Sequence, residues 1–226
     1  MMRLPDLKKF AHQHELPIIS IDELVHYRIN AEIKSICTTV LPTSWGVFNQ
    51  SIYHDHLGRE HVLMSLGSIS AQDKPLVRIH SECLTGDVFE SLRCDCGAQL
   101  KESLRLIGQE GAGILIYLRQ EGRGIGLTEK IKAYALQDQG LDTVEANHAL
   151  GHVTDARRYE VVIKMLYDLA ITNIRLLTNN PHKISYLELH GIVVARVPLL
   201  VETNQYNERY QQSKAKKMGH AIPFFD

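Results

Sequence analysis

The sequence predicts a layered α/β/α domain built around a mixed β-sheet. Two patterns indicate this class. Short apolar runs of strand type alternate with helical stripes through the second half of the chain, and an extended, turn-rich stretch precedes them. The chain has 226 residues, of which 44% are hydrophobic and 23% charged. It is therefore long enough to bury a core and has the composition of an ordinary globular protein.

The N-terminal 30 residues have the pattern of a small helical unit. Leu7, Phe10 and Ala11 recur at helical spacing, and Asp22 is placed to cap a second helix that runs through Tyr27. From residue 33 the pattern changes to β-branched and aromatic runs bounded by turn residues. These predict strands at 38–43, 45–48, 62–67 and 76–80.

The second half of the chain alternates between the two periodicities. A helix is expected to start at Thr85 and to be interrupted by the cysteines near residue 95, after which Leu100, Leu104 and Ile107 form a helical stripe that ends at glycine. Further strands are predicted at 114–118, 174–177 and 192–197, and further helices at 127–139, 159–170 and 181–190. The charged stretch 206–218 predicts a solvent-exposed terminal helix.

Charge and hydropathy exclude several classes of protein. The chain carries 25 Lys and Arg against 26 Asp and Glu. This balance gives no support for a protein that binds nucleic acids or membrane surfaces through overall positive charge. No run approaches the roughly 20 apolar residues that span a bilayer, and the N-terminus lacks the apolar region of a signal peptide. We expect a cytoplasmic protein with reduced thiols. Any anionic ligand must then be bound by a local cluster of positive charge.

Three of the four cysteines, Cys83, Cys94 and Cys96, lie within 14 residues, and Cys37 stands alone. Clustered thiolates suit zinc, either in an open catalytic site with three protein ligands or in a closed structural site. A closed site would take its fourth ligand from Cys37 or from a histidine such as His80. Buried, unreactive cysteines are the remaining alternative. Cys94 and Cys96 are separated by one residue and lie beside Arg93, a pattern that favours metal binding over buried, unreactive cysteines.

Several longer motifs resemble GTP cyclohydrolase II. They are residues 78–87 (RIHSECLTGD), 92–97 (LRCDCG), 119–127 (RQEGRGIGL), 133–138 (AYALQD), 142–147 (DTVEAN) and 177–181 (LTNNP). The resemblance runs in order from about residue 38 to residue 219. It implies hydrolysis of GTP to 2,5-diamino-6-hydroxy-4-(5-phosphoribosylamino)pyrimidine, formate and pyrophosphate, the first step of riboflavin biosynthesis. It also implies one zinc ion per chain, magnesium on the nucleotide phosphates, and a homodimer.

The resemblance also implies roles for individual residues. Cys83, Cys94 and Cys96 would bind zinc and leave a fourth position for the water that opens the imidazole ring. Tyr134 matches a tyrosine near the zinc, although packing alone could account for it. Asp155 and Arg157 match a proton acceptor and a nucleophile for pyrophosphate release. Because arginine stays protonated, Arg157 could instead clamp the phosphate while water attacks. An ordinary Asp–Arg surface pair is a further alternative.

By the same resemblance, a longer set of residues contacts the nucleotide. It comprises Arg78, Ile79, His80, Ser81, Glu82, Gln99, Glu121, Gly122, Arg123, Thr143, Thr178 and Lys183. Glu121 is a candidate acceptor for the N1–H and amino hydrogens of guanine. The positive charge that a triphosphate needs is expected from six side chains in or beside these motifs: Arg78, Arg93, Arg119, Arg123, Arg157 and Lys183.

The first 30 residues resemble the C-terminal end of dihydroxybutanone phosphate synthase, through motifs at 3–7, 10–14 and 21–28. The sequence therefore predicts a leader at residues 1–30 and a GTP cyclohydrolase II domain at residues 31–226. Fusion to an upstream synthase domain is expected, with a plain amphipathic extension as the alternative.

Two other functions are compatible with the same motifs. The scaffold could open the ring and stop at the formamide intermediate, an outcome against which Tyr134 argues. Alternatively, the chain could be a non-catalytic module that binds zinc and a nucleotide or protein partner. That module would carry four protein ligands on zinc, and loss of Cys37 or His80 would release the metal.

Overall fold

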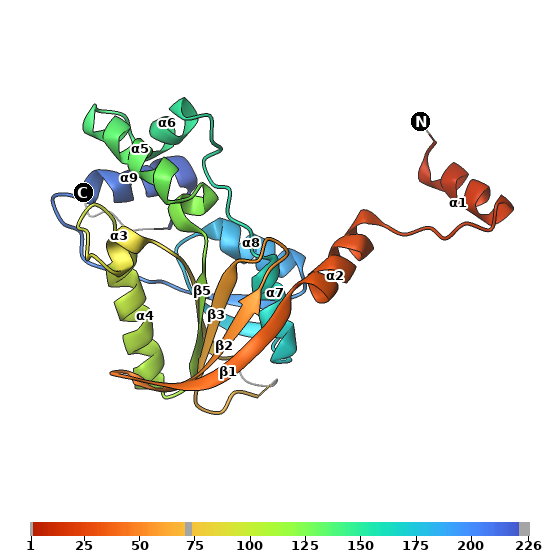
Figure 1. Ribbon diagram of the computed structural model, residues 1–226, viewed down its shortest axis with the longest axis horizontal. Helices are drawn as coiled ribbons and strands as arrows, with labels where there is room; N and C mark the ends of the chain where they lie inside the picture. Colours follow the sequence, from red (N-terminus) through yellow and green to blue (C-terminus); the bar gives the residue numbers. More distant parts are fainter. Residues whose placement is uncertain (1, 71–73, 222–226) are drawn as a thin grey trace.

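The computed structural model describes residues 2–70 and 74–221. A seven-stranded sheet forms its centre, with strand order β1-β2-β3-β5-β4-β6-β7 (Figure 1). The strands are β1 (Lys34–Thr43), β2 (Gly46–His54), β3 (Glu60–Leu66), β4 (Leu76–Ser81), β5 (Gly113–Leu118), β6 (Asn173–Leu177) and β7 (Val193–Val197). Pairing is antiparallel from β1 through β3 to β5 and parallel from β5 through β4 and β6 to β7. The predicted mixed sheet is confirmed.

Helices cover both faces of this sheet. The helices of the described residues are α1 (Leu4–Gln13), α2 (Ile21–Glu32), α3 (Leu84–Asp87), α4 (Cys96–Glu110), α5 (Leu127–Asp138), α6 (Thr143–Ala149), α7 (Glu160–Asp168), α8 (Pro181–Leu189) and α9 (Glu208–Met218), with a short 3-10 helix η1 (Glu121–Gly124). Leu104 and Ile107 of α4 pack on one face, and α7, Leu187 of α8 and Ile29 of α2 pack on the other. Successive residues of β5 alternate between the two cores, as the two-residue period of a strand requires.

The parallel half of the sheet determines at which edge a ligand pocket is expected. The strands β4, β5 and β6 run in the same direction, so their carboxyl ends meet at one edge. Helices α3, α5, α6 and α9 gather at this end, beside the turn that leads into α4 (Figure 1). Crevices at the carboxyl ends of parallel strands are the usual ligand sites of such sheets. No helix in the described part of the chain is both long and apolar enough to cross a lipid bilayer.

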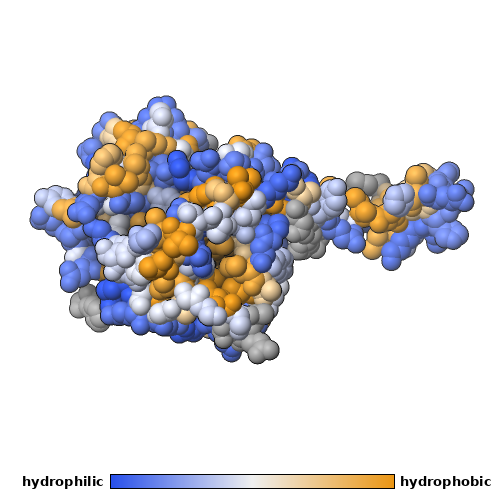
Figure 2. Space-filling model, turned by 60° about the horizontal axis from the view of Figure 1, so that its bottom comes forward, coloured by the Kyte–Doolittle hydropathy of each residue, from blue (hydrophilic) through white to orange (hydrophobic). Residues whose placement is uncertain are grey.

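The N-terminal segment extends away from the body of the molecule (Figure 1). Figure 2 shows hydrophobic surface on this segment. Leu4, Leu7 and Phe10 of α1 are exposed. The predicted Asp22 cap is wrong, because α2 begins one residue earlier. Ser20 is its N-cap and forms a capping box with Glu23. The predicted domain boundary at residue 30 falls within α2.

Three other elements differ from the sequence prediction. The strand predicted at 45–48 runs on through polar Asn49, Gln50 and Ser51 to His54, because β1 and β3 pair with it along this length. Helix α6 was not predicted; Asp142 caps it through the backbone amides of Val144 and Glu145. The terminal helix α9 exists, but it is not simply solvent-exposed: Gln211, Lys214 and Met218 are buried at a spacing that defines one helix face.

Candidate active site

A pocket of about 1020 Å³, its open mouth included, lies at the carboxyl ends of β4, β5 and β6. Every predicted catalytic, nucleotide-binding or metal-binding residue lines it except Ile79 and Asp155. Asp155 is bonded to the lining residue Arg157, and the carbonyl of Ile79 accepts a hydrogen bond from the lining residue Lys183 at 2.7 Å. Motifs that lie up to 105 residues apart in the sequence, from Arg78 to Lys183, therefore surround one pocket.

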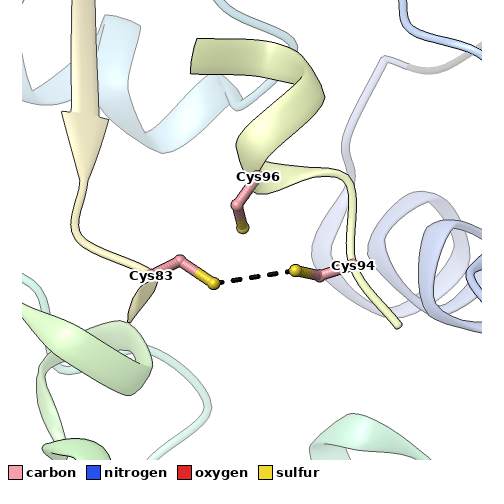
Figure 3. A group of neighbouring side chains, drawn as sticks. All are labelled: Cys83, Cys94 and Cys96. Atoms are coloured by element: carbon pink, nitrogen blue, oxygen red, sulfur yellow. Dashed lines mark hydrogen bonds between the residues drawn. The ribbon is translucent and has the colours of Figure 1, made fainter. Parts of the chain in front are cut away.

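The three clustered cysteines meet at one wall of the pocket. Figure 3 shows their sulfur atoms directed toward one another. Cys83 follows β4 and precedes α3, Cys94 lies in the turn before α4, and Cys96 is the first residue of α4. All three Sγ atoms lie within 4.8 Å of one another, and those of Cys83 and Cys94 are 3.6 Å apart.

The described residues bring no further histidine, cysteine or carboxylate into this cluster. Cys37 is exposed on β1. His80 uses Nε2 to contact the two carboxylate oxygens of Asp87, at 3.0 and 3.1 Å. Among the described residues the cluster thus offers three thiol ligands, the number that an open zinc site takes from the protein.

Donor chemistry and packing both fit a zinc ion. A tetrahedral site with Zn–S distances of about 2.3 Å requires sulfur atoms about 3.8 Å apart, close to the observed Cys83–Cys94 separation. Gly86 makes room for the cluster. A Cβ there would lie 2.9 Å from the sulfur of Cys94 and 3.2 Å from that of Cys83. Hydrogen bonding to Cys83, together with burial, raises the pKa of Cys94 to about 11, so without a cation the cluster resists holding several thiolates.

A buried lysine lies against the cysteine cluster. Lys130 of α5 donates to the sulfur of Cys83 at 3.0 Å and to Glu121 at 2.8 Å. Glu121 also accepts hydrogen bonds from the amides of Gly122 and Leu84. Its carboxylate thus has three protein partners and joins α3, η1 and α5. Glu121 also lines the pocket, and its role in guanine recognition stays a prediction.

A second buried network positions the backbone of Cys83. Asp87 accepts hydrogen bonds from the Cys83 amide at 3.0 Å and from the Tyr117 hydroxyl at 2.8 Å, and it also contacts His80. Burial lowers the pKa of His80, and the nearby Arg78 guanidinium lowers it further, although Asp87 opposes the shift. The imidazole is therefore neutral at pH 7 and is held in a fixed orientation.

Positive charge also converges on this pocket. Arg78, on β4, donates to the carbonyl of Leu177 at 2.9 Å and to Gln99 at 2.7 Å. Burial, followed by the like charges of Arg78 and Arg157, lowers the pKa of Lys183 well below its usual value. These cations repel one another, so an anion in the pocket would stabilise all of them.

Two of the six cations predicted to bind phosphate do not line the pocket. Arg93 pairs with Asp138 at 2.7 Å and lies over the ring of Tyr134. Arg119 pairs with Glu82 at 3.0 Å. Both pairs are partly exposed, and the sequence could not distinguish them because they flank the same motifs. Arg78, Arg123, Arg157 and Lys183 remain as the pocket's cations from that set.

Asp155 and Arg157 form a tight ion pair beside the pocket. The Nε atom of Arg157 lies 2.8 and 3.1 Å from the two Asp155 oxygens, and its Nη2 contacts the same carboxylate. Burial alone would lower the pKa of Arg157, but Tyr159 and Asp155 reverse this effect and the pKa is raised. The guanidinium is therefore held in its protonated form.

Tyr134 of α5 lines the pocket close enough to Cys94 and Cys83 for their charges to act on its phenol. Burial raises the pKa of its phenol to about 12, so the hydroxyl stays protonated and can donate a hydrogen bond. Lys130 and Arg93 approach the ring at 5.6 and 4.6 Å from its centroid. These cation–π contacts hold the ring in place without engaging the hydroxyl.

The pocket contains an unusual concentration of unpartnered polar atoms. Six buried side-chain nitrogen or oxygen atoms in the described residues have no hydrogen-bond partner. Five belong to residues that line the pocket: Arg78 Nε, Ser81 Oγ, Arg123 Nη2, Asn180 Nδ2 and His220 Nε2. Because an unsatisfied buried polar group is costly, such a concentration indicates that a polar ligand completes the site.

The loop after β5 adopts a strained conformation. Gly122 and Arg123 both have left-handed backbone angles, with φ of 60° and 59°. This conformation is uncommon for a side chain such as arginine. The carbonyl of Arg123 accepts a hydrogen bond from the Ala156 amide at 3.0 Å, which ties the loop to the Asp155–Arg157 segment. Arg123 lines the pocket in this conformation. Its hydrogen bond to Ala156 joins the 119–127 motif to the Asp155–Arg157 segment.

The side chains that line the pocket and that sequence reasoning missed include Lys130, Tyr210, Lys214 and His220. Lys130 lies three residues before the motif that begins at Ala133, within the regular helix α5. The other three come from the charged C-terminal stretch. Gln211, Lys214 and Met218 share one buried helix face, but two of them are polar, so no apolar stripe in the sequence identifies this helix as partly buried.

Comparison with known proteins agrees with this geometry. The family model for GTP cyclohydrolase II matches residues 34–198. The chain is 48% identical to the riboflavin biosynthesis protein RibBA of Bacillus subtilis over 229 residues, which cover 99% of this chain and 58% of that protein. It is 49% identical to the protein of the same name from Aquifex aeolicus, over 97% of this chain and 55% of that protein.

A third relative, from Arabidopsis thaliana, is named monofunctional riboflavin biosynthesis protein RIBA 3, chloroplastic. It is 46% identical over 97% of this chain and 44% of its own length. The chain therefore spans about half the length of the curated relatives it matches. The family match covers most of the chain and includes the three cysteines, Tyr134 and the Asp155–Arg157 pair. This chain belongs to the GTP cyclohydrolase II family.

Proposed function

We propose that this protein is a zinc-dependent GTP cyclohydrolase II. It hydrolyses GTP to 2,5-diamino-6-hydroxy-4-(5-phosphoribosylamino)pyrimidine, formate and pyrophosphate. The observation that carries the proposal is the joining of two features in one pocket: a three-thiol cluster with a free corner, and a set of unpaired cations and polar atoms facing it. Ring hydrolysis needs the first feature, and a nucleotide triphosphate needs the second.

Cys83, Cys94 and Cys96 would hold the zinc ion, which supplies Lewis-acid activation of water for attack on C8. Tyr134 donates its phenolic proton toward the reacting ring, because its raised pKa keeps the hydroxyl protonated. Lys130 compensates the charge of the Cys83 thiolate through its 3.0 Å contact. The polar groups of His80 and Asp87 keep that cysteine in place.

The phosphates occupy the cationic side of the pocket. Arg78 and Arg123 each offer a buried guanidinium nitrogen that has no protein partner. Lys183 adds a buried ammonium that is destabilised without an anion. Forked guanidinium groups suit phosphate oxygens, so these side chains orient the triphosphate, with magnesium as the accompanying cation.

For pyrophosphate release we favour Arg157 as a phosphate clamp rather than a nucleophile. An arginine attacks phosphorus only after losing a proton, and the Asp155 ion pair raises the pKa of this guanidinium. Asp155 holds Arg157 toward the pocket and can accept a proton from an attacking water. The clamp predicts that no phosphorylated protein accumulates during turnover, which intact-protein mass spectrometry under quenched-flow conditions can check.

The test of the proposed function is incubation with GTP, zinc and magnesium, with three products measured separately. Equal amounts of formate, pyrophosphate and diaminopyrimidine are expected. A formylated pyrimidine without free formate would instead identify an enzyme that stops at the formamide intermediate. Unchanged GTP with retained nucleotide binding would identify a non-catalytic module.

The larger setting of this domain is also a proposal. Its curated relatives are longer, and the exposed apolar residues of α1 offer a surface for a preceding synthase domain. We propose that residues 1–30 connect such a domain to a catalytic domain at residues 31–226, and that the protein acts as a cytoplasmic homodimer. Mass measurement of the protein isolated from its native host checks the first point, and light scattering checks the dimer.

A further inference from the structure

The C-terminal helix α9 reaches the cysteine cluster through a buried ion pair. The Nζ atom of Lys214 lies 3.0 and 2.8 Å from the two carboxylate oxygens of Asp95. The side chains of both residues are at most 9% exposed. Asp95 is the single residue between Cys94 and Cys96. Helix α9 lies beyond residues 34–198, the part of the chain that matches the family model.

The ion pair ends a chain of buried hydrogen bonds across the pocket. Gln99 donates to Asp95 at 2.7 Å, and its amide oxygen accepts a hydrogen bond from Arg78 at 2.7 Å. Asp95 is therefore held from two directions, by Gln99 on α4 and by Lys214 on α9. The Asp95 side chain does not cap α4, although Asp95 is the residue that precedes it. Its carboxylate serves tertiary contacts instead.

We propose that Lys214 is a positioning residue of the metal site. This proposal rests on the proposed function, because it requires that the three cysteines bind zinc. The Lys214 ammonium holds the Asp95 carboxylate and so fixes the turn that carries Cys94 and Cys96. The C-terminal helix α9 then helps to hold the metal-binding cysteines in position. Residues that support metal ligands without touching the ion commonly change affinity by about 10- to 100-fold.

Removal of the Lys214 ammonium would change the surroundings of the Asp95 carboxylate. Among the described residues, Asp95 would keep the neutral Gln99 as its direct side-chain partner, and Arg78, bonded to Gln99, would act on its charge from farther away. A buried charge that has lost its directly bonded counter-ion is unfavourable, so the side chain would rotate toward water or draw water in. Because Asp95 is bonded directly to both Cys94 and Cys96, this movement displaces two of the three thiolates. A metal site tolerates about 0.2 Å of such displacement.

The experiment is a cobalt titration of the whole protein, freed of metal, since Co²⁺ in a tetrahedral thiolate site has strong sulfur-to-metal absorption. Wild type is compared with Lys214→Met, with the conservative Lys214→Arg, and with Lys216→Met as a matched control on the exposed side of the same helix. We expect Lys214→Met to bind Co²⁺ about 10- to 100-fold more weakly, with an altered spectrum. Lys214→Arg recovers most of the affinity, and Lys216→Met equals wild type.

A double variant, Asp95→Asn with Lys214→Met, separates the ion pair from general damage to the fold. Replacing a buried pair by two neutral groups removes the unpaired charge, so Co²⁺ affinity should return to within about threefold of wild type. Failure of wild type to give thiolate absorption would overturn the metal site itself. Normal binding by Lys214→Met, or weak binding that the double variant does not rescue, would overturn the role of Lys214 while leaving the proposed function intact.

Discussion

Replacing Gly86 by alanine should damage the metal site with little change elsewhere. The added Cβ would lie 2.9 Å from the sulfur of Cys94, whereas ordinary contacts begin near 3.4 Å, so one of the two must move by about half an ångström. Overpacking of this kind costs about 1–3 kcal/mol, which corresponds to about 5- to 150-fold weaker zinc binding if the strain is felt only by the metal-bound form. Competition with a chromophoric zinc chelator measures the affinity.

Gly58→Ala is the control for backbone strain. Its φ of 72° makes a side chain unfavourable, but a Cβ there meets nothing within 4 Å. It should lower the unfolding free energy by about 1–2 kcal/mol and leave zinc affinity unchanged. If Gly86→Ala binds zinc as tightly as wild type and releases formate at the wild-type rate, the close packing of the three cysteines around Gly86 is not a requirement of the site.

Three further perturbations test other parts of the account. Cys94→Ser should lose zinc, ring opening and formate release, measured by metal analysis and product assay, whereas the exposed Cys37→Ser should behave as wild type. Arg157→Ala should reduce pyrophosphate release at least as much as ring opening; loss of ring opening alone would contradict its placement at the α-phosphate. Burial alone would raise the pKa of Asp55, but hydrogen bonds within its turn lower it to about 2. Its stabilising charge is therefore fully present above about pH 4 and is lost as the pH falls toward 2. Urea denaturation should show Asp55→Asn to be less stable than wild type at pH 7, with the difference shrinking below pH 4.

Much of the fold could be predicted from local patterns. The apolar strand β5 and the proline-started helix α8 lie close to their expected bounds, because both signals are local and strong. The polar half of β2 could not be predicted, since its partners on β1 and β3 are distant in sequence. The partial burial of α9 depends on a lysine meeting a carboxylate 119 residues away.

The site residues, too, were predictable where the signal is local and not where it depends on tertiary contacts. Motif resemblance identified the residues at the strand ends, because each motif is a short continuous segment. It could not separate Arg78, which lines the pocket, from Arg119, which does not line it and pairs with the lining residue Glu82. Nor could it find Lys130, whose contact with Cys83 is created by the packing of α5 against the turn after β4. Contacts of this kind are set by tertiary structure rather than by spacing.

The central claim is that metal held by the three cysteines is required for hydrolysis at C8 of GTP. The most direct measurement follows formate from GTP labelled with ¹³C at C8, by NMR, with the protein as isolated, after zinc removal, and after zinc is restored. The account predicts one formate per GTP consumed, loss of the signal without zinc, and recovery as zinc approaches one equivalent per chain. Undiminished formate release from protein shown to be free of metal would contradict it.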